Sequence, residues 1–446
     1  MIRLTWVQPE DLIGHELAQS ELEGRDVAPL RTRWLDAGGH LAPATAGASP
    51  TPAPPHLRAL AEQLLDELAP PPPLRAGVPH GESGIPRSRE AENLHALRHR
   101  LHAAWLGRAA GCLLGKPVEK LPLDGIRALA KATGNWPLHT WFTERGVPPE
   151  LRATYPWNRR SAPTSLAENI DGMPEDDDLN YPLLNLVLLQ RHGKTFTTTD
   201  VARLWLDELP AGRTFTAERI AYRNLLDGIE PPHTATHRNP FREWIGALIR
   251  ADLHGWTNPG APEAAAEQAY RDAALTHTEN GVHGAVFAAA TIADAATGRA
   301  DVHQCLNTGL AAVPAASRLA EAVRHAVRLA HGTRDFDEVV DRLHERYATH
   351  HWVHVVPNTA LVAAALTHAD GDFTGSITRA VSGGWDTDSN GATAGSVAGL
   401  LAGRPDRIPD RWTTPLKNRL ATSIGDFDGI GFDTLAELTA REAHRP

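Results

Sequence analysis

Two short acidic clusters, far apart in the chain, hold the side chains best suited to chemistry. The first is Glu175–Asp178 (EDDD), and the second combines Asp386 and Asp388 with the hydroxyl of Ser389. Their oxygen atoms are hard donors, which suit Mg²⁺, Mn²⁺ or Ca²⁺ better than Zn²⁺. Each cluster alone is also typical of a solvated helix cap. Together they predict a site for divalent cations.

The sequence around each cluster strengthens this prediction. The run Tyr181–Leu189 is so apolar that a helix there must be buried, and Pro182 is acceptable in its first turn. We therefore expect the carboxylates of Glu175–Asp178 in the loop and cap that enter this helix, where a cation would offset their repulsion. The second cluster is followed by small residues, Gly391–Gly399, which allow a helix to approach its neighbours closely. Its spacing does not fit the EF-hand loop.

Three blocks of sequence occur in a characteristic order: Gly111–Glu119 (GCLLGKPVE), Glu175–Asp178 and Gly384–Asn390 (GWDTDSN). In this order and context they resemble the ADP-ribosylglycohydrolase family, over about residues 95–405. The resemblance implies an all-α fold with two divalent cations, Mg²⁺ or Mn²⁺, at the centre of a cleft. It also implies hydrolysis of N- or O-ribosyl bonds of an ADP-ribosyl group by water activated at that site.

The resemblance implies metal ligands in both clusters. These ligands are Glu175, Asp176, Asp177, Asp386, Asp388 and Ser389. Four positions depart from the usual family pattern: Glu175 and Ser389 stand in place of threonines, Cys112 in place of an aspartate and Trp385 in place of a glycine.

The same resemblance implies catalytic and substrate-binding residues. Glu119, which ends the first block, and Asp177 are the candidates for general acid or base, and a carboxylate that is not a metal ligand suits this role better. The expected substrate-binding residues are Gly115, Asp178, Asn280, Gly281, His283 and Trp385. Without the resemblance, Glu119 is typical of a surface residue, and Asn280-Gly281 is typical of an ordinary turn before a helix.

Helices must position these residues. Apolar residues at three- and four-residue spacing, with much alanine, predict several helices after Glu90. The segments are Asn93–Leu114, Tyr181–Arg191, Asp200–Leu209, Pro262–Ala274, Gly284–Thr297, Ala315–His331 and Asn358–Thr367. Alternating β patterns are scarce. We expect an all-α fold with many helices in one compact domain.

The first 90 residues differ in composition from the rest. Two Pro/Ala-rich stretches, Ala42–Pro55 and Ala69–Pro73, favour extended linkers, and His56–Leu68 between them predicts an amphipathic helix. We therefore expect an appended region, residues 1–90, and an ADP-ribosylglycohydrolase-like helical domain, residues 91–446.

Two further features suit packing as well as binding. The aromatic stretch Trp136–Trp157 could stack on a base or pack against the body of the protein. His351 and His354 lack the additional ligands that a zinc site needs, so we expect structural roles for both.

Composition limits the classes of partner and the location that we expect for the protein. A formal net charge of −10 argues against a nucleic-acid polymer. The sequence has only two cysteines (Cys112 and Cys305), no signal-peptide pattern and no long apolar stretch. These features predict a cytoplasmic protein without a membrane span. Nothing in the sequence sets the oligomeric state.

The expected substrate is an ADP-ribosylated protein or a small ADP-ribosyl or nucleotide-derived molecule. Two alternatives stay open: a relative that acts on an NAD-derived biosynthetic metabolite, and a non-catalytic family member that binds ADP-ribose or serves a structural role. Retention of most acidic residues in their clusters argues against the non-catalytic alternative.

Overall fold

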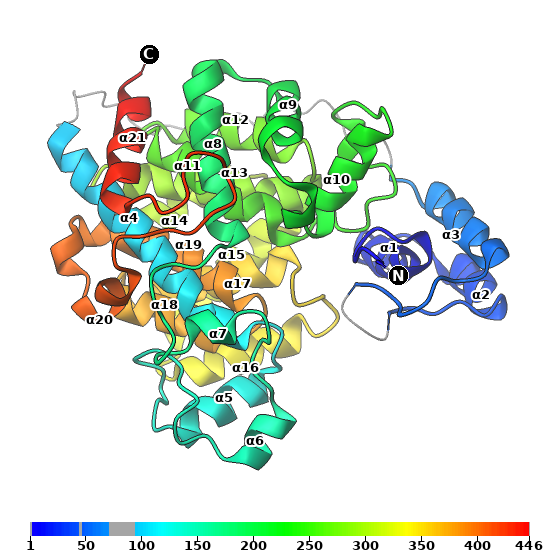
Figure 1. Cartoon of the computed structure of the whole chain (residues 1–446), viewed down its shortest axis with the longest axis horizontal. Coiled ribbons are helices and arrows are strands. Elements are labelled where there is room, and N and C mark those ends of the chain that lie inside the picture. Colours follow the sequence, from blue (N-terminus) through cyan, green and yellow to red (C-terminus); the bar gives the residue numbers. More distant parts are fainter. Residues whose placement is uncertain (1, 44–46, 71–93, 446) are drawn as a thin grey trace.

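The computed structural model describes residues 2–43, 47–70 and 94–445, and these residues form helices joined by loops (Figure 1). This described part of the chain contains no β-strand, and its extended segments meet only in isolated bridges, such as those of Leu420 with Met173 and Ile430. The predicted all-α class is therefore confirmed. None of the described helices has the length and apolar character needed to cross a membrane.

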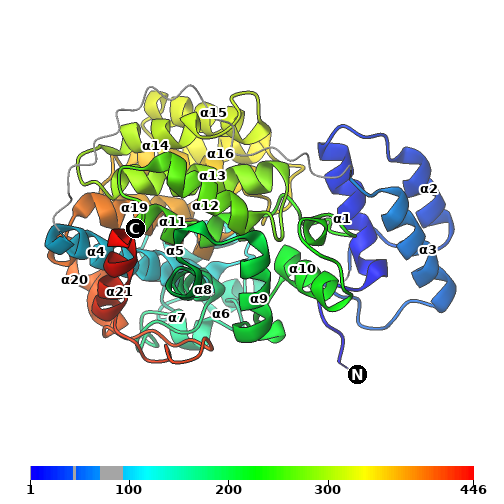
Figure 2. The ribbon, with the colours of Figure 1, turned by 90° about the horizontal axis from the view of Figure 1, so that it is seen from above.

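Three helices near the N-terminus form a unit at one end of the long axis of the molecule (Figures 1 and 2). They are α1 (Pro9–Leu22), α2 (Ala28–Asp36) and α3 (Pro55–Glu67). The helix predicted at His56–Leu68 corresponds to α3. It begins at Pro55, where the missing N–H of proline costs no helical hydrogen bond.

The remaining described residues form the body of the molecule. Its α-helices are α4 (Leu94–Gly115), α5 (Leu123–Ala132), α6 (Pro149–Thr154), α7 (Ala162–Ser165), α8 (Asp177–His192), α9 (Thr198–Glu208), α10 (Thr216–Leu226), α11 (Asp252–Trp256), α12 (Pro262–Ala273), α13 (Glu279–Ala295), α14 (Val302–Ala311), α15 (Arg318–Gly332), α16 (Phe336–Arg346), α17 (Val355–His368), α18 (Phe373–Ser382), α19 (Thr387–Ala402), α20 (Asp410–Thr413) and α21 (Phe432–His444). Short 3₁₀ helices link them: η1 (Lys116–Val118), η2 (Gly193–Thr195), η3 (Ala211–Arg213), η4 (His233–Ala235), η5 (Ile245–Arg250), η6 (Pro405–Arg407) and η7 (Thr414–Leu416).

Helices α4 and α19 pack against each other along a seam of glycines. A Cβ atom added to Gly111 would lie 1.8 Å from the carbonyl oxygen of Gly391, and one added to Gly107 would lie 2.1 Å from that of Gly395. Such distances exclude every side chain larger than hydrogen, so the two backbones are in direct contact. This contact brings the end of α4 beside the start of α19.

Helix α8 begins earlier than the sequence predicts. It starts at Asp177, so Pro182 lies inside the helix and not in its first turn. Proline in this position leaves the carbonyl oxygen of Asp178, four residues earlier, without its helical donor. Nε of Arg108 donates to that oxygen at 2.7 Å. The predicted loop position is therefore wrong for Asp177 and Asp178, and the contact with Arg108 explains how the helix accommodates proline.

Candidate metal centre

The first turns of α8 and α19 meet beside the C-terminal end of α4. Oγ of Ser389 donates to Oδ2 of Asp178 at 3.3 Å, a contact between residues 211 positions apart that joins the two acidic clusters. Oγ1 of Thr387 donates to the carbonyl oxygen of Gly115 at 2.8 Å. Both helices place the positive end of their dipole at this acidic site.

The first group of possible ligand atoms belongs to Cys112, Asp176 and Asp178, which are buried and lie within 4.8 Å of one another. Each carboxylate in this first group has a basic partner. Lys116 forms an ion pair with Asp176, and Arg108 forms one with Asp178 at 3.2 Å. Sγ of Cys112 lies 3.8 Å from Oδ2 of Asp178. The first group therefore contains two cationic side chains of its own.

The second group of possible ligand atoms belongs to Glu119, Asp386 and Asp388, again within 4.8 Å of one another. Glu119 forms an ion pair with Lys120 at 2.9 Å and accepts a hydrogen bond from Nδ2 of Asn158 at 2.6 Å. Within the described chain, neither Asp386 nor Asp388 has a basic side chain at ion-pair distance. The second group thus places two buried carboxyl groups without a basic side chain at ion-pair distance.

An asparagine of α17 fixes the backbone of the second group. Oδ1 of Asn358 accepts hydrogen bonds from the backbone N–H of Asp386 at 3.1 Å and from Nδ2 of Asn390 at 2.7 Å. Asn358 is itself fully buried, and its Nδ2 donates to the carbonyl oxygen of His354 at 2.9 Å. Helix α17 therefore sets the start of α19.

The electrostatics of the two groups differ. Burial, followed by the neighbouring Asp388 and Glu119 carboxylates, raises the pKa of Asp386 well above its usual value. Burial, with Glu119 and Asp176, raises the pKa of Asp388 to about 7. Burial also opposes ionisation of Asp176, but Lys116 holds the pKa of that carboxyl below its usual range.

Buried carboxylates in such proximity require a proton or a cation to offset their repulsion. The second group offers three converging carboxylates, which are the hard oxygen ligands that Mg²⁺ and Mn²⁺ prefer. These residues therefore fit a divalent cation.

Asp177 belongs to neither group. Its side chain is half-buried, and the described residues offer it no hydrogen-bond or ion-pair partner. Burial, with the carboxylates of Asp176 and Asp178, raises its pKa well above the usual value. Asp177 is thus an unengaged carboxylate in the first turn of α8, and its expected catalytic and metal-binding roles stay predictions.

Glu175 points to different partners. Its carboxylate forms an ion pair with Arg213 at 2.7 Å and accepts hydrogen bonds from Nδ2 of Asn180 at 3.1 Å and the backbone N–H of Ser423 at 2.9 Å. The structure therefore does not bring Glu175 into either group of ligand atoms. Its predicted role as a metal ligand receives no support from these contacts.

Two of the expected substrate-binding residues make structural contacts. Nδ2 of Asn280 donates to Glu243 at 3.0 Å, and its Oδ1 accepts from the backbone N–H of Leu319 at 2.9 Å. A Cβ atom at Gly281 would lie 2.3 Å from the carbonyl oxygen of Arg242. Asn280 thus links α13 to α15, and the glycine permits a close approach of backbone rather than a turn before the helix.

The other expected substrate-binding residues have varied surroundings. His283 is half-buried, its Nδ1 has no hydrogen-bond partner in the described chain, and burial lowers its pKa to about 4. The ring of Trp385 stacks on His344, with centroids 4.1 Å apart and an interplanar angle of 9°. Gly115 abuts the backbone of Thr387. The contribution of each to substrate binding stays a prediction.

The aromatic stretch and the histidine pair pack within the protein. Trp141 makes an edge contact with Trp412 at a centroid distance of 4.8 Å. His351 stacks on Trp244 at 4.2 Å, and Nδ1 of His354 accepts from the N–H of Val356 at the start of α17.

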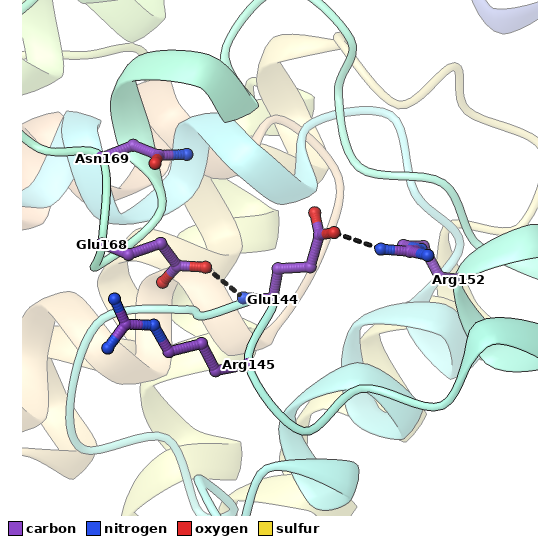
Figure 3. A pocket seen from close by; sticks show the side chains of 5 residues that line it. All are labelled: Glu144, Arg145, Arg152, Glu168 and Asn169. Carbon is purple, nitrogen blue, oxygen red and sulfur yellow. Dashed lines mark hydrogen bonds and ion pairs between the residues drawn. The ribbon is translucent and has the colours of Figure 1, made fainter.

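A surface cavity of about 410 Å³ lies among loops between α5 and α8 (Figure 3). It is lined by Glu144, Arg145, Arg152, Glu168 and Asn169. Two contacts join these residues: Arg152 forms an ion pair with Glu144, and Glu168 accepts a hydrogen bond from the backbone N–H of Glu144 at 2.9 Å. No residue of the acidic clusters lines this cavity, so we do not assign the reaction to it.

Four residues of the centre were not predicted from the sequence: Arg108, Lys116, Asn158 and Asn358. Arg108 offered one signal, because an arginine within the apolar and Gly/Ala-rich segment that forms α4 requires a buried acidic partner. Lys116 lies inside the block that carries the family resemblance. The two asparagines offered no signal.

Comparisons with known proteins identify the family of the chain. A sequence model described as ADP-ribosylglycohydrolase matches residues 93–444. An uncharacterized protein of Archaeoglobus fulgidus is 26% identical over 317 residues, which are 70% of this chain and 90% of that protein. A solved structure named "ADP-ribosylglycohydrolase-related protein complex" is 20% identical with a TM-score of 0.46, and the match covers 79% of this chain and 99% of that one. Because the family match spans most of the sequence, the chain belongs to the ADP-ribosylglycohydrolase family.

Proposed function

We propose that this protein hydrolyses the N- or O-glycosidic bond of an ADP-ribosyl group with the help of a divalent cation. The observation that carries the proposal is the meeting of the two acidic clusters, which the Ser389–Asp178 hydrogen bond joins at the ends of three helices. Family membership supports a glycohydrolase activity in general. The bond, the metal dependence and the residue roles are our proposal.

The reaction builds positive charge on the ribose as the bond to its anomeric carbon breaks. The carboxylates of the second group favour such charge, because they are held in place before the reaction begins. Glu119 is one of the three carboxylates of this group, and Asn158 and Lys120 fix its orientation. We assign to Glu119 the removal of a proton from the attacking water, and to Asp386 and Asp388 the binding of the cation. A bound divalent cation would supply Lewis-acid polarisation and orient ribose hydroxyls. Asp177 is the second candidate, either as this base or as the acid that protonates the leaving group, since it has no partner in the described chain.

Release of ADP-ribose tests the proposal. The panel contains ADP-ribosyl-arginine and ADP-ribosyl-serine, attached to protein and as free amino acids, together with NAD and O-acetyl-ADP-ribose. We expect release from at least one substrate, with loss on chelation, recovery with Mg²⁺ or Mn²⁺, and a loss of roughly 100-fold or more in Asp386→Asn. Full activity of this variant, or release unaffected by chelation, would refute the site.

The same panel distinguishes the classes of substrate. Release from modified protein alone identifies a protein de-modifying enzyme, whereas release from small molecules alone identifies an enzyme of nucleotide-derived metabolites. Calorimetric binding of ADP-ribose without turnover of any compound would indicate the non-catalytic alternative. A cytoplasmic location remains a prediction from the sequence.

A further inference from the structure

The two groups of possible ligands differ in the charge that the chain itself supplies. In the first group both carboxylates have a basic partner, Lys116 for Asp176 and Arg108 for Asp178. In the second group, Glu119 forms an ion pair with Lys120, but the described chain places no basic side chain at ion-pair distance from Asp386 or Asp388. The expectation of two divalent cations rests on the family resemblance, which does not anticipate this difference between the groups.

Lys116 is held inside the acidic site. Its side chain is only 8% exposed, and that of its partner Asp176 only 7%. The residue follows Gly115, where an added Cβ atom would lie 2.3 Å from the carbonyl carbon of Thr387. Lys116 therefore lies directly after the end of α4 and beside the start of α19. Its ammonium group lies among acidic residues, away from solvent.

We propose that the ammonium of Lys116 takes the place of one of the two expected cations, so that each chain binds a single divalent ion at the second group. This inference rests on the proposed function, because it concerns the metal content of the same site. A second ion at the first group would have to separate Lys116 from Asp176 and would bring two positive charges close together in a region of low dielectric. The fully buried guanidinium of Arg108 pairs with the other carboxylate of that group, Asp178, at 3.2 Å and also with the buried Asp252 at 2.9 Å.

Charge balance supports a single ion at the second group. Its three carboxylates and the Lys120 ammonium have a formal net charge of −2, which one divalent cation neutralises. Lys120 is half-exposed, so solvent screens its contribution. Lys116, in contrast, acts at a position that solvent hardly reaches.

Metal stoichiometry of the full chain tests the inference. The protein is stripped with chelator and titrated with Mn²⁺ alone by calorimetry, and the loaded samples are examined by electron paramagnetic resonance. We expect one Mn²⁺ per wild-type chain, with the six-line spectrum of an isolated ion. Lys116→Met should bind two, and its spectrum should show coupling between neighbouring Mn²⁺ ions. Lys116→Arg, which retains the charge, should bind one.

Lys120→Met is the matched control, because Lys120 also pairs with a carboxylate but lies near the surface. It should still bind one ion. Two ions in the wild type, one ion in Lys116→Met, or two ions in Lys120→Met would each overturn the inference. Thermal unfolding checks that every variant is folded, and Lys116→Gln replaces Lys116→Met if the latter is not.

The outcomes separate this inference from the proposed function. Binding of two ions by an active wild-type enzyme refutes the role of Lys116 and leaves the hydrolase intact. One ion in the wild type and two in Lys116→Met, without ADP-ribose release from any substrate, support the role of Lys116 and refute the hydrolase. Absence of Mn²⁺ binding in all variants refutes both the inference and the proposed metal dependence.

Discussion

Trp385 holds a backbone conformation that favours glycine. Its φ is +57° and follows Gly384 at +77°, so two successive left-handed residues lead into α19. For a residue with a Cβ atom this conformation costs about 1–2 kcal/mol. The ring is nevertheless almost completely buried, and its stack on His344 accounts for a large side chain at this position.

Replacing Trp385 should separate these two effects. Trp385→Ala removes the buried ring but retains the strain, and we expect a loss of roughly 3–5 kcal/mol in the free energy of unfolding. Trp385→Gly loses the same ring but relieves the strain, so it should be more stable than the alanine variant by about 1 kcal/mol. Urea unfolding of the three proteins provides the comparison. A glycine variant less stable than the alanine variant would show that backbone strain at this position is negligible.

The identity of the acidic residues could be predicted from the sequence, but their partners could not. Asp386 and Asp388 were recognisable because their types, spacing and order follow a known pattern. The contact of Glu175 with Arg213 depends on a residue in another segment. The sequence EDDD alone does not show that the first of its four carboxylates points away from the metal centre. The pairing of Lys116 with Asp176 also joins two separate segments, so the sequence did not predict it. Side-chain partners of this kind are set by tertiary packing.

At the scale of helices, the α4–α19 contact determines the geometry of the site. Cys112 and Lys116 come from α4 and its extension η1, whereas Asp388 and Ser389 come from the first turn of α19. The glycine seam holds these segments at a fixed distance, since neither backbone can move closer. A small separation of the helices would therefore shift every ligand relative to its partners.

Gly111→Ala should disrupt this geometry. Because the new Cβ atom would meet the carbonyl oxygen of Gly391 at 1.8 Å, we expect a loss of roughly 1–3 kcal/mol in the free energy of unfolding and a weaker affinity for Mn²⁺. The control is Gly332→Ala at the end of α15, where no atom lies within 4 Å of the added Cβ. The control should retain stability and affinity. Calorimetric titration and thermal unfolding of both variants measure the effects, and equal behaviour of the two would contradict a close-packed seam.

Helix positions were predictable where periodicity alone decides them. The segments Pro262–Ala274 and Asn93–Leu114 agree closely with α12 and α4. For α13 the prediction began at Gly284, five residues late, because Asn280 and Gly281 favour turns. The backbone N–H of Asn280 donates to Glu243 at 3.3 Å, and this tertiary contact supports a helix start that local preferences oppose.

At the scale of the whole molecule, the α1–α3 unit packs against the body through an aromatic cluster. Trp6 contacts Phe241, Trp244 and His351 with centroid distances of 5.6, 5.8 and 6.5 Å, and His15 lies 5.5 Å from His351. The family match begins at residue 93, so this unit lies outside it. The boundary expected at residue 90 lies outside the described residues.

This junction should make stability depend on pH. Burial lowers the pKa of His15 to about 4, against the opposing charge of Asp11, and burial with His15 and His354 lowers the pKa of His351 to about 3. Both histidines are neutral in the folded and unfolded states above about pH 6.5, so the effect is absent there. As the pH falls from 6.5 toward 4, only the unfolded chain takes up these protons, and each histidine removes up to about 1.4 kcal/mol of stability per pH unit. Urea unfolding at pH 7.5, 6.5 and 5.5 should show a smaller slope for His351→Phe than for the wild type; identical slopes would contradict the assignment.

Arg242 is the principal ionic contact between the α1–α3 unit and the body. It is fully buried and forms paired hydrogen bonds of 2.8–2.9 Å with both Glu16 and Glu23 of the N-terminal segment. Arg242→Met would leave the buried carboxylate of Glu16 with Arg25 as its one basic partner among the described residues, 3.2 Å away and partly exposed, and with a hydrogen bond from Ser20. We expect a loss of roughly 3–5 kcal/mol in the free energy of unfolding, since a buried charge loses its main partner.

A second arginine at the same junction provides a control for the Arg242→Met variant. Arg238 pairs with Asp66 of α3 at 2.7 Å, but Asp66 is half-exposed, so Arg238→Met should cost less than about 1 kcal/mol. Hydrogen exchange should show faster exchange of α1 amides in Arg242→Met, whereas the amides of α4 and α19 remain protected, because the metal centre does not depend on the contacts of Arg242 with Glu16 and Glu23. If the α1 amides exchange at the same rate in both arginine variants, the aromatic cluster alone accounts for the stable packing of the α1–α3 unit against the body. Faster exchange in α4 and α19 as well would instead mean that the N-terminal helices and the body unfold as one cooperative structure.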